Sequence, residues 1–211
     1  MSVIGFLGAG RLAQMLAPKV AKAGWKVILS NSRGPQSLGD IVAGIEGDVT
    51  AATPADMVKA SDIVVLAIRW PQIEDATKGL DWSGKIVIDA TNNRLGPKPE
   101  DVIDIGGVLS SDIVAAAVPG ARLVKAFNHE PIPVFGQSLP PQGDANVLFL
   151  AGSDQQANAL VAQLIRDLGA EPVDLGPIDQ GGKLIAMGGP LTNKFKLYSK
   201  VEAQAAIDAA H

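Results

Sequence analysis

The sequence predicts an α/β fold in which helices cover both faces of a doubly wound, mostly parallel sheet. Short apolar runs typical of buried strands alternate with helical segments along the 211 residues. A Gly-Ala-Gly turn separates the first apolar run from the first helix, as in nucleotide-binding βαβ units. The 47% hydrophobic content and the 23 glycines also suit a parallel sheet that is buried on both faces.

The first third of the chain contains two expected strands and three expected helices. The apolar strands are residues 3–7 and 26–29, joined by a helix over 10–23 that ends at Gly24 and contains Pro18. A short helix is expected over residues 35–45. A third helix begins at Thr53-Pro54, since Thr is a good cap and Pro suits the first helical position.

Three further strands and two short helices are expected before residue 130. The strands are residues 63–68, 85–90 and 123–127, all rich in Ile, Val and Leu. Pro71 opens one helix, and Ser111 is expected to cap the other, over residues 112–118.

Residues 131–143 hold four prolines and two glycines, so a loop is expected between a core, residues 1–130, and an extension, residues 144–211. Both belong to a single domain, residues 1–211. The extension comprises a strand over 147–151, a helix from the Ser153 cap to near residue 168, an edge strand over 171–175, an irregular stretch over 176–190 and a helix over 194–210. The last helix is inferred from apolar residues at spacings suited to a helical face: Phe195, Leu197, Val201, Ala205 and Ala209.

The turn Gly8-Ala9-Gly10-Arg11-Leu12-Ala13 predicts a Rossmann-type dinucleotide site. Gly8 permits a tight turn, Gly10 lets a diphosphate approach the backbone, and small Ala13 allows close packing of helix and strand. The N-terminus of the helix supplies free N–H groups and a partial positive charge to the diphosphate.

The end of the second strand favours NADP over NAD. An NAD enzyme usually carries Asp or Glu there, whereas this chain has Asn31. Ser32 can donate a hydrogen bond, and Arg33 can form a forked pair with a 2′-phosphate. The alternative is that Arg33 is a solvated turn residue before Gly34-Pro35.

Polar or bulky residues follow three other strands, and their ends meet at one crevice in such a sheet. They are Arg69-Trp70, Thr91-Asn92 and Asn128-His129. Thr91 and Asn92 are candidates for holding the nicotinamide, and His129 for facing a substrate. The alternatives are core packing for Trp70, turn formation for Thr91 and Asn92, and loop capping for His129.

Several kinds of function are disfavoured. The net charge of −4 gives no support for nucleic-acid binding, and the absence of cysteine excludes disulfides and thiolate chemistry. No apolar stretch approaches the twenty residues of a membrane span, so we expect a soluble, cytoplasmic protein. His129 is the only internal histidine and His211 is the last residue, so we expect no metal site built on histidines. No acid–base machinery is evident, which fits direct hydride transfer between two cofactors.

Four segments together resemble the deazaflavin-dependent NADP oxidoreductase family, whose members transfer hydride between NADP(H) and coenzyme F-420. They are Gly8-x-Gly10-x-x-Ala13, the run Ser30 to Pro35, the strand end Asp89-Ala90-Thr91-Asn92 and, most specifically, Val124-Lys125-Ala126-Phe127-Asn128. The NADPH-binding domain of STEAP-type metalloreductases is also similar.

The resemblance implies a role for each candidate residue. Ser32 and Arg33 would bind the 2′-phosphate, Ala9 to Leu12 the diphosphate, Ala67, Ile68, Arg69, Trp70 and Asn92 the nicotinamide, and Asn128 and His129 the second ring. It also implies a homodimer whose C-terminal elements help to form the acceptor pocket. The chain departs from the family at residues 179–183 and in the proline-rich loop, so the acceptor is either F-420 or a flavin.

Two alternatives remain open. Gly181-Gly182-Lys183-Leu184 faintly resembles the catalytic lysine segment of β-hydroxyacid dehydrogenases and imine reductases, but this chain lacks the length of their helical domain. A non-enzymatic NADP(H) sensor would also explain the missing proton donors. An exposed apolar patch without a ring-sized cleft would favour the sensor.

Overall fold

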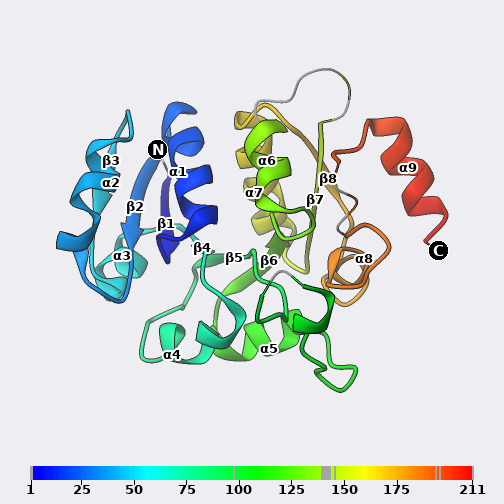
Figure 1. The fold of residues 1–211 in the computed structure, drawn as a ribbon, viewed down its shortest axis with the longest axis horizontal. Helices are drawn as coiled ribbons and strands as arrows, with labels where there is room; N and C mark the ends of the chain where they lie inside the picture. The colour runs from blue at the N-terminus through cyan, green and yellow to red at the C-terminus, as the bar shows by residue number, and fades with distance from the viewer. Residues whose placement is uncertain are drawn as a thin grey trace.

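The computed structural model describes residues 2–96, 98–138, 144, 146–192, 194 and 196–210. Within these residues, eight strands form one sheet in the order β3-β2-β1-β4-β5-β6-β7-β8 (Figure 1). All neighbouring strands are parallel except β6 and β7, which are antiparallel. The strands are β1 (Val3–Leu7), β2 (Lys26–Ser30), β3 (Val49–Ala51), β4 (Ile63–Leu66), β5 (Ile86–Asp89), β6 (Arg122–Ala126), β7 (Val147–Gly152) and β8 (Glu171–Asp174). The predicted doubly wound, mostly parallel sheet is confirmed, although β3 was not expected.

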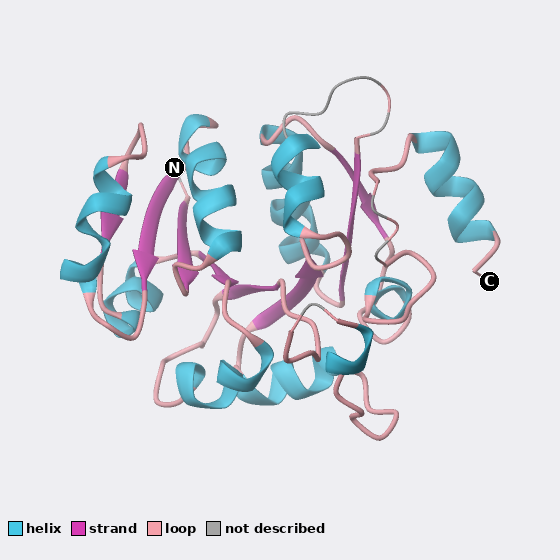
Figure 2. Ribbon diagram, viewed as in Figure 1, coloured by secondary structure: helices cyan, strands magenta, loops and turns pink. Residues whose placement is uncertain are grey.

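Helices cover both faces of this sheet (Figure 2). One face packs against α1 (Arg11–Lys22), α6 (Ile132–Ser138) and α7 (Gln155–Asp167). The opposite face packs against α3 (Pro54–Ala60), α4 (Ile73–Thr77) and α5 (Ser110–Ala117), and against α8 (Gly181–Ile185) and α9 (Lys200–Asp208) over β7. Short α2 (Gly39–Ala43) and the 3-10 turns η1 (Pro35–Leu38), η2 (Trp70–Gln72) and η3 (Pro99–Asp101) complete the described helices.

Alternate residues of the central strands enter different apolar clusters. In β4, Ile63 and Val65 pack on the α1 face, whereas Val64 and Leu66 pack on the α3 face. Full burial on both sides explains why these strands are continuous apolar runs rather than alternating ones.

Two helix starts differ from the expected ones because another side chain forms the cap or no side chain does. The carboxylate of Asp154, not Ser153, accepts the N–H of Ala157 at the start of α7. Ser153 Oγ instead accepts the Ile178 N–H at 3.4 Å. α5 begins at Ser110, and the buried Ser111 donates a hydrogen bond to Asp89 instead of capping the helix.

The expected loop over residues 131–143 contains α6. Pro131 precedes the helix, where its missing N–H is harmless, and the buried Phe135 anchors α6 in the core beside α1. Residues 139–143, which belong to the same expected loop, lie outside the described part.

The C-terminal elements also differ from expectation. The stretch over 176–190 includes the short α8, and α9 starts at Lys200 rather than residue 194, because Ser199 and Glu202 form a capping box there. Val201 is 81% exposed, while Ala203 is buried and Ile207 packs partly against the core. The expected apolar face was therefore wrong at Val201, Ala205 and Ala209, which are all exposed, whereas Leu197 is buried. Phe195 lies outside the described residues.

Candidate functional site

The turn between β1 and α1 requires glycine at position 8. Gly8 has a φ of +99°, and a Cβ at this position would lie 2.5 Å from the carbonyl oxygen of Ala67. The Gly8 N–H donates to the Ser30 carbonyl at 3.0 Å, which ties the turn to the end of β2. The tight turn predicted from the sequence is thus explained by its contact with the end of β4.

Gly10 leaves space on the other side of this turn. A Cβ at Gly10 would meet no atom closer than Ala67 O at 3.9 Å. In the described residues, α1 has no side-chain cap and no acidic residue in its first turn, so neither offsets the partial positive charge at the start of the helix. Ala13 is fully buried between helix and sheet. This arrangement suits a diphosphate.

A cleft of about 890 Å³ runs along the carboxyl ends of the central strands. It is lined by thirteen of the sixteen residues proposed from the sequence: Gly8, Ala9, Gly10, Arg11, Leu12, Asn31, Ser32, Arg33, Ala67, Ile68, Arg69, Asn92 and Asn128. Trp70, Thr91 and His129 are not on its wall. Lining residues that the sequence analysis missed include Gln72, Leu80, Arg94, Phe127, Glu130, Pro131 and Ile132.

The charges on the cleft wall are mostly positive. Of the described residues, five cationic and two acidic ones line it, in a chain of net charge −4: Arg11, Arg33, Arg69, Lys78 and Arg94 against Asp75 and Glu130. Such a concentration of positive charge favours an anionic ligand.

In the turn after β2, the side chain of Asn31 makes hydrogen bonds within the turn, whereas the side chains of Ser32 and Arg33 take no part in them. Asn31 Oδ1 accepts the backbone N–H of Arg33 at 2.9 Å, and Asn31 Nδ2 donates to Ser37 Oγ at 2.9 Å. Asn31 therefore shapes the turn, while Ser32 and Arg33 stay exposed on the cleft wall. Within the described part of the chain, the guanidinium of Arg33 forms no ion pair.

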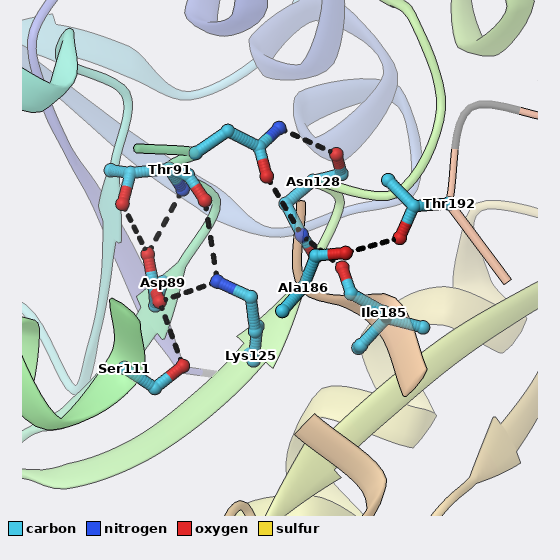
Figure 3. Close-up of polar contacts among 9 residues, drawn as sticks. Asp89, Thr91, Ser111, Lys125, Asn128, Ile185, Ala186 and Thr192 are labelled. Atoms are coloured by element: carbon cyan, nitrogen blue, oxygen red, sulfur yellow. Dashed lines mark hydrogen bonds and ion pairs between the residues drawn. The ribbon is translucent and has the colours of Figure 1, made fainter. Parts of the chain in front are cut away.

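Two asparagines connect the ends of β5 and β6 with the C-terminal extension (Figure 3). Asn92 Nδ2 donates to the carbonyl of Asn128 at 2.8 Å, and Asn128 Nδ2 donates to Asn92 Oδ1 at 3.2 Å and Ile185 O at 2.6 Å. The preceding Phe127 has a φ of +60°, unusual for a residue with a side chain, and turns the backbone sharply after β6. Both asparagine side chains are thereby fixed where they line the cleft.

Below Asn92 lies a buried polar network that the sequence analysis also missed. Asp89 Oδ1 accepts hydrogen bonds from the N–H and hydroxyl of Thr91, at 2.9 and 2.6 Å. Asp89 Oδ2 lies 2.8 Å from Lys125 Nζ. Thr91 is thus a turn-forming residue, which was the alternative to a role in holding the nicotinamide. The sequence did contain a signal for this network: Asp89 and Lys125 each lie in an otherwise apolar strand, and a buried charge needs a partner.

His129 is enclosed by aromatic side chains instead of facing the cleft. Its ring centroid lies 5.5 Å from those of Phe135 and Phe149, and neither ring nitrogen has a hydrogen-bond partner within the residues that the structure describes. Burial, reinforced by the charge of Lys125, lowers the pKa of His129 to about 3. The imidazole is therefore neutral at physiological pH and is badly placed to donate a proton to a ligand in the cleft.

Trp70 is half-buried and packs against the apolar cluster under α3 and α4. This position matches the alternative that Trp70 is a core-packing residue.

None of the helices in the described residues combines the length and the apolar character that a membrane span requires. Nor does that part of the chain contain a group of three or more His, Asp or Glu side chains arranged to hold a metal ion.

Comparison with known proteins gives three kinds of match. The sequence model of the family described as coenzyme F420-dependent NADP oxidoreductase matches residues 3–93, which include the β1–α1 turn, Ser32, Arg33 and Asn92. The crystal structure of a hypothetical protein, SMa0349 from Sinorhizobium meliloti, is 38% identical with a TM-score of 0.84. That match covers 95% of this chain and 97% of the other.

More distant relatives share the fold or part of their length. A putative F420-dependent NADP-reductase from Arthrobacter sp. FB24 is 21% identical, with a TM-score of 0.71 over 92% of this chain and 97% of that one. The metalloreductase STEAP2 of Mus musculus is 25% identical over 86% of this chain and 35% of its own length. The chain thus spans about a third of the length of the curated relatives it matches.

The matched segment contains the glycine turn and the Ser32-Arg33 pair, and the match to the Sinorhizobium structure extends the similarity over nearly the whole chain. The chain therefore belongs to the coenzyme F420-dependent family of NADP oxidoreductases.

Proposed function

We propose that this protein binds NADP(H) in the cleft and transfers hydride between it and a flavin or a deazaflavin such as coenzyme F-420. The observation that carries the proposal is the position of Ser32 and Arg33. They lie on the cleft wall directly after β2, where NAD enzymes place an acid for the ribose 2′-hydroxyl. A guanidinium without an acidic partner suits the 2′-phosphate of NADP(H).

The remaining parts of the dinucleotide have matching partners along the cleft. The uncapped start of α1, from Ala9 to Leu12, suits the diphosphate, and the open Cβ position of Gly10 admits it close to the backbone. Ala67, Ile68 and Arg69 follow β4, and with Asn92 they form the wall that we assign to the nicotinamide.

The acceptor is assigned to the end of the cleft formed by residues 127–132. When bound, NADPH supplies the hydride, so the protein needs to position two rings and exclude water rather than supply a proton donor. The buried, neutral His129 is consistent with that role. The Arthrobacter relative is described as a putative F420-dependent NADP-reductase, which supports the same acceptor class.

A redox sensor is the second candidate, because apolar side chains are exposed beyond Asn92. Leu95, Val102, Val108 and Ile113 are 38–61% exposed and offer a surface for a partner protein. The imine reductase alternative has less support: a Pseudomonas imine reductase shares only the fold, at 18% identity and a TM-score of 0.58, and Lys183 does not line the cleft.

A homodimer remains part of our proposal, and light scattering would test it.

The experiment is stopped-flow absorbance with NADPH and separate samples of riboflavin, FMN, FAD and coenzyme F-420. We expect oxidation of NADPH by at least one of them, together with loss of the acceptor's own absorbance. NADPH binding without turnover on any acceptor would contradict hydride transfer and favour the sensor.

A further inference from the structure

A second cavity, of about 550 Å³, lies between the segment leading into α5 and the segment around α8. None of its lining residues belongs to the cleft described above. The lining is Asn93, Ile105, Gly107, Val108, Leu109, Ser110, Asp112, Asp179, Lys183, Ala186 and Met187.

The floor of this second cavity contains a polar group without a partner. The hydroxyl of Ser110 is buried, with the residue only 3% exposed, and has no hydrogen-bond partner among the described residues. A buried hydroxyl left in that state costs roughly 1–3 kcal/mol, so most of them are satisfied by protein, water or ligand. Ser110 is one of the lining residues, so its unpartnered hydroxyl lies in the wall of the cavity.

The rim determines what kind of ligand fits. Lys183, Asp112 and Asp179 line the cavity and are exposed, and within the described residues Lys183 forms no ion pair. Two carboxylates accept hydrogen bonds from hydroxyl groups, and one ammonium donates to them. A phosphate would meet two carboxylates and one ammonium, a lining whose net charge is negative. The charges therefore favour an uncharged, hydroxyl-rich chain over an anion.

The residues that line the second cavity lie next to residues that line the cleft at two places. Asn92 lines the cleft and Asn93 the second cavity. On the other wall, Asn128 lines the cleft and binds the carbonyl of Ile185, and the next residue, Ala186, lines the second cavity (Figure 3). A molecule whose ring lies beside Asn92 and Asn128 is thus adjacent to the second cavity.

We propose that the second cavity binds the hydroxylated ribityl side chain of the acceptor, a chain that flavins and deazaflavins share. Ser110, Asp112, Asp179 and Lys183 bind its hydroxyl groups. The inference rests on the proposed function, because that function defines the acceptor class.

The test compares riboflavin with lumiflavin, which has the same ring without the hydroxylated chain. Flavin fluorescence is titrated against the full chain loaded with NADP⁺, for the wild type, Ser110→Ala, Lys183→Gln and the control Lys22→Ala on the exposed end of α1. We expect the wild type to bind riboflavin tighter than lumiflavin and FMN no tighter than riboflavin. Each cavity variant should weaken riboflavin roughly three- to tenfold and leave lumiflavin unchanged.

Ser110→Ala removes a hydroxyl without a hydrogen-bond partner in the described part of the chain, so the variant should fold normally, which thermal unfolding checks. Equal affinities of the wild type for the two flavins, or equal losses in the variants, would overturn the proposal. So would the failure of both riboflavin and coenzyme F-420 to bind. Because these affinities are measured without turnover, an absence of NADPH oxidation counts against hydride transfer separately.

Discussion

Lys125 Nζ lies 2.8 Å from Asp89 Oδ2, and neither side chain has any exposure to solvent. The two residues are directly paired on β5 and β6. Lys125 also donates to the carbonyl of Thr91 at 3.3 Å, so the ion pair fixes the turn that presents Asn92 (Figure 3). The pair therefore joins the two strand ends that support the cleft.

Removing one member of this pair should destabilise the protein more than removing both charges. Lys125→Met leaves the carboxylate of Asp89 buried without a counter-charge, which costs about 3–5 kcal/mol. The double variant Asp89→Asn, Lys125→Met leaves no buried charge and should recover part of that loss. Urea unfolding followed by circular dichroism measures both. A double variant less stable than Lys125→Met would show that the pair is not coupled in this way.

The two glycines of the β1–α1 turn should respond differently to alanine. Gly8→Ala places a Cβ against Ala67 at a φ of +99°, so we expect a clear loss of thermal stability. Gly10→Ala meets no close atom and has an ordinary φ of −79°, so the fold should be unaffected. Its Cβ should instead weaken NADPH binding at least about tenfold, because the diphosphate needs that space. Unchanged NADPH affinity of a folded Gly10→Ala would contradict the assigned diphosphate site.

His129 should make folding stability depend on pH in acid. Its pKa is about 3 in the folded protein and near the ordinary value of 6.5 when unfolded. The unfolded chain therefore binds the extra proton first. The neutral ring's contribution is fully present above pH 6.5 and is lost as the pH falls toward 3, at up to about 1.4 kcal/mol per pH unit.

His129→Leu serves as the comparison, since it retains an apolar side chain between Phe135 and Phe149. Urea unfolding at pH 5 and pH 8 gives the free energy of unfolding for both proteins, and the carboxylates common to both cancel. We expect wild type to lose more stability between pH 8 and 5 than the variant does. Identical losses would mean that His129 is not held neutral.

Much of the fold was predictable from the sequence because local and tertiary signals agree. The buried strands are uninterrupted apolar runs, and Thr53-Pro54 starts α3 as expected, with Thr53 Oγ1 accepting the Asp56 N–H. The start of α5 was misjudged because Ser111 donates to the buried Asp89 and no side chain caps the helix. The start of α7 was misjudged because the neighbours Ser153 and Asp154 are both good caps. Only the packing of the helix decides among them.

The cleft was partly predictable for a similar reason. Residues that directly follow strands, such as Ser32, Ile68 and Asn92, necessarily gather at one edge of a parallel sheet. Glu130 and Ile132 line the cleft through the start of α6, which the prolines of that segment concealed. The enclosure of His129 depends on Phe149 of β7, an antiparallel strand whose position the local sequence does not reveal.

The most direct test of the account is the affinity of Arg33→Ala for NADPH and NADH, measured by isothermal titration calorimetry. Arg166→Ala, which removes an exposed arginine of α7 outside the cleft, is the matched control. Loss of a charge-assisted contact to the 2′-phosphate should weaken NADPH roughly tenfold to a hundredfold and leave NADH nearly unchanged. If Arg33→Ala weakened both dinucleotides equally, or neither, the assignment of the cleft to NADP(H) through Arg33 would be wrong.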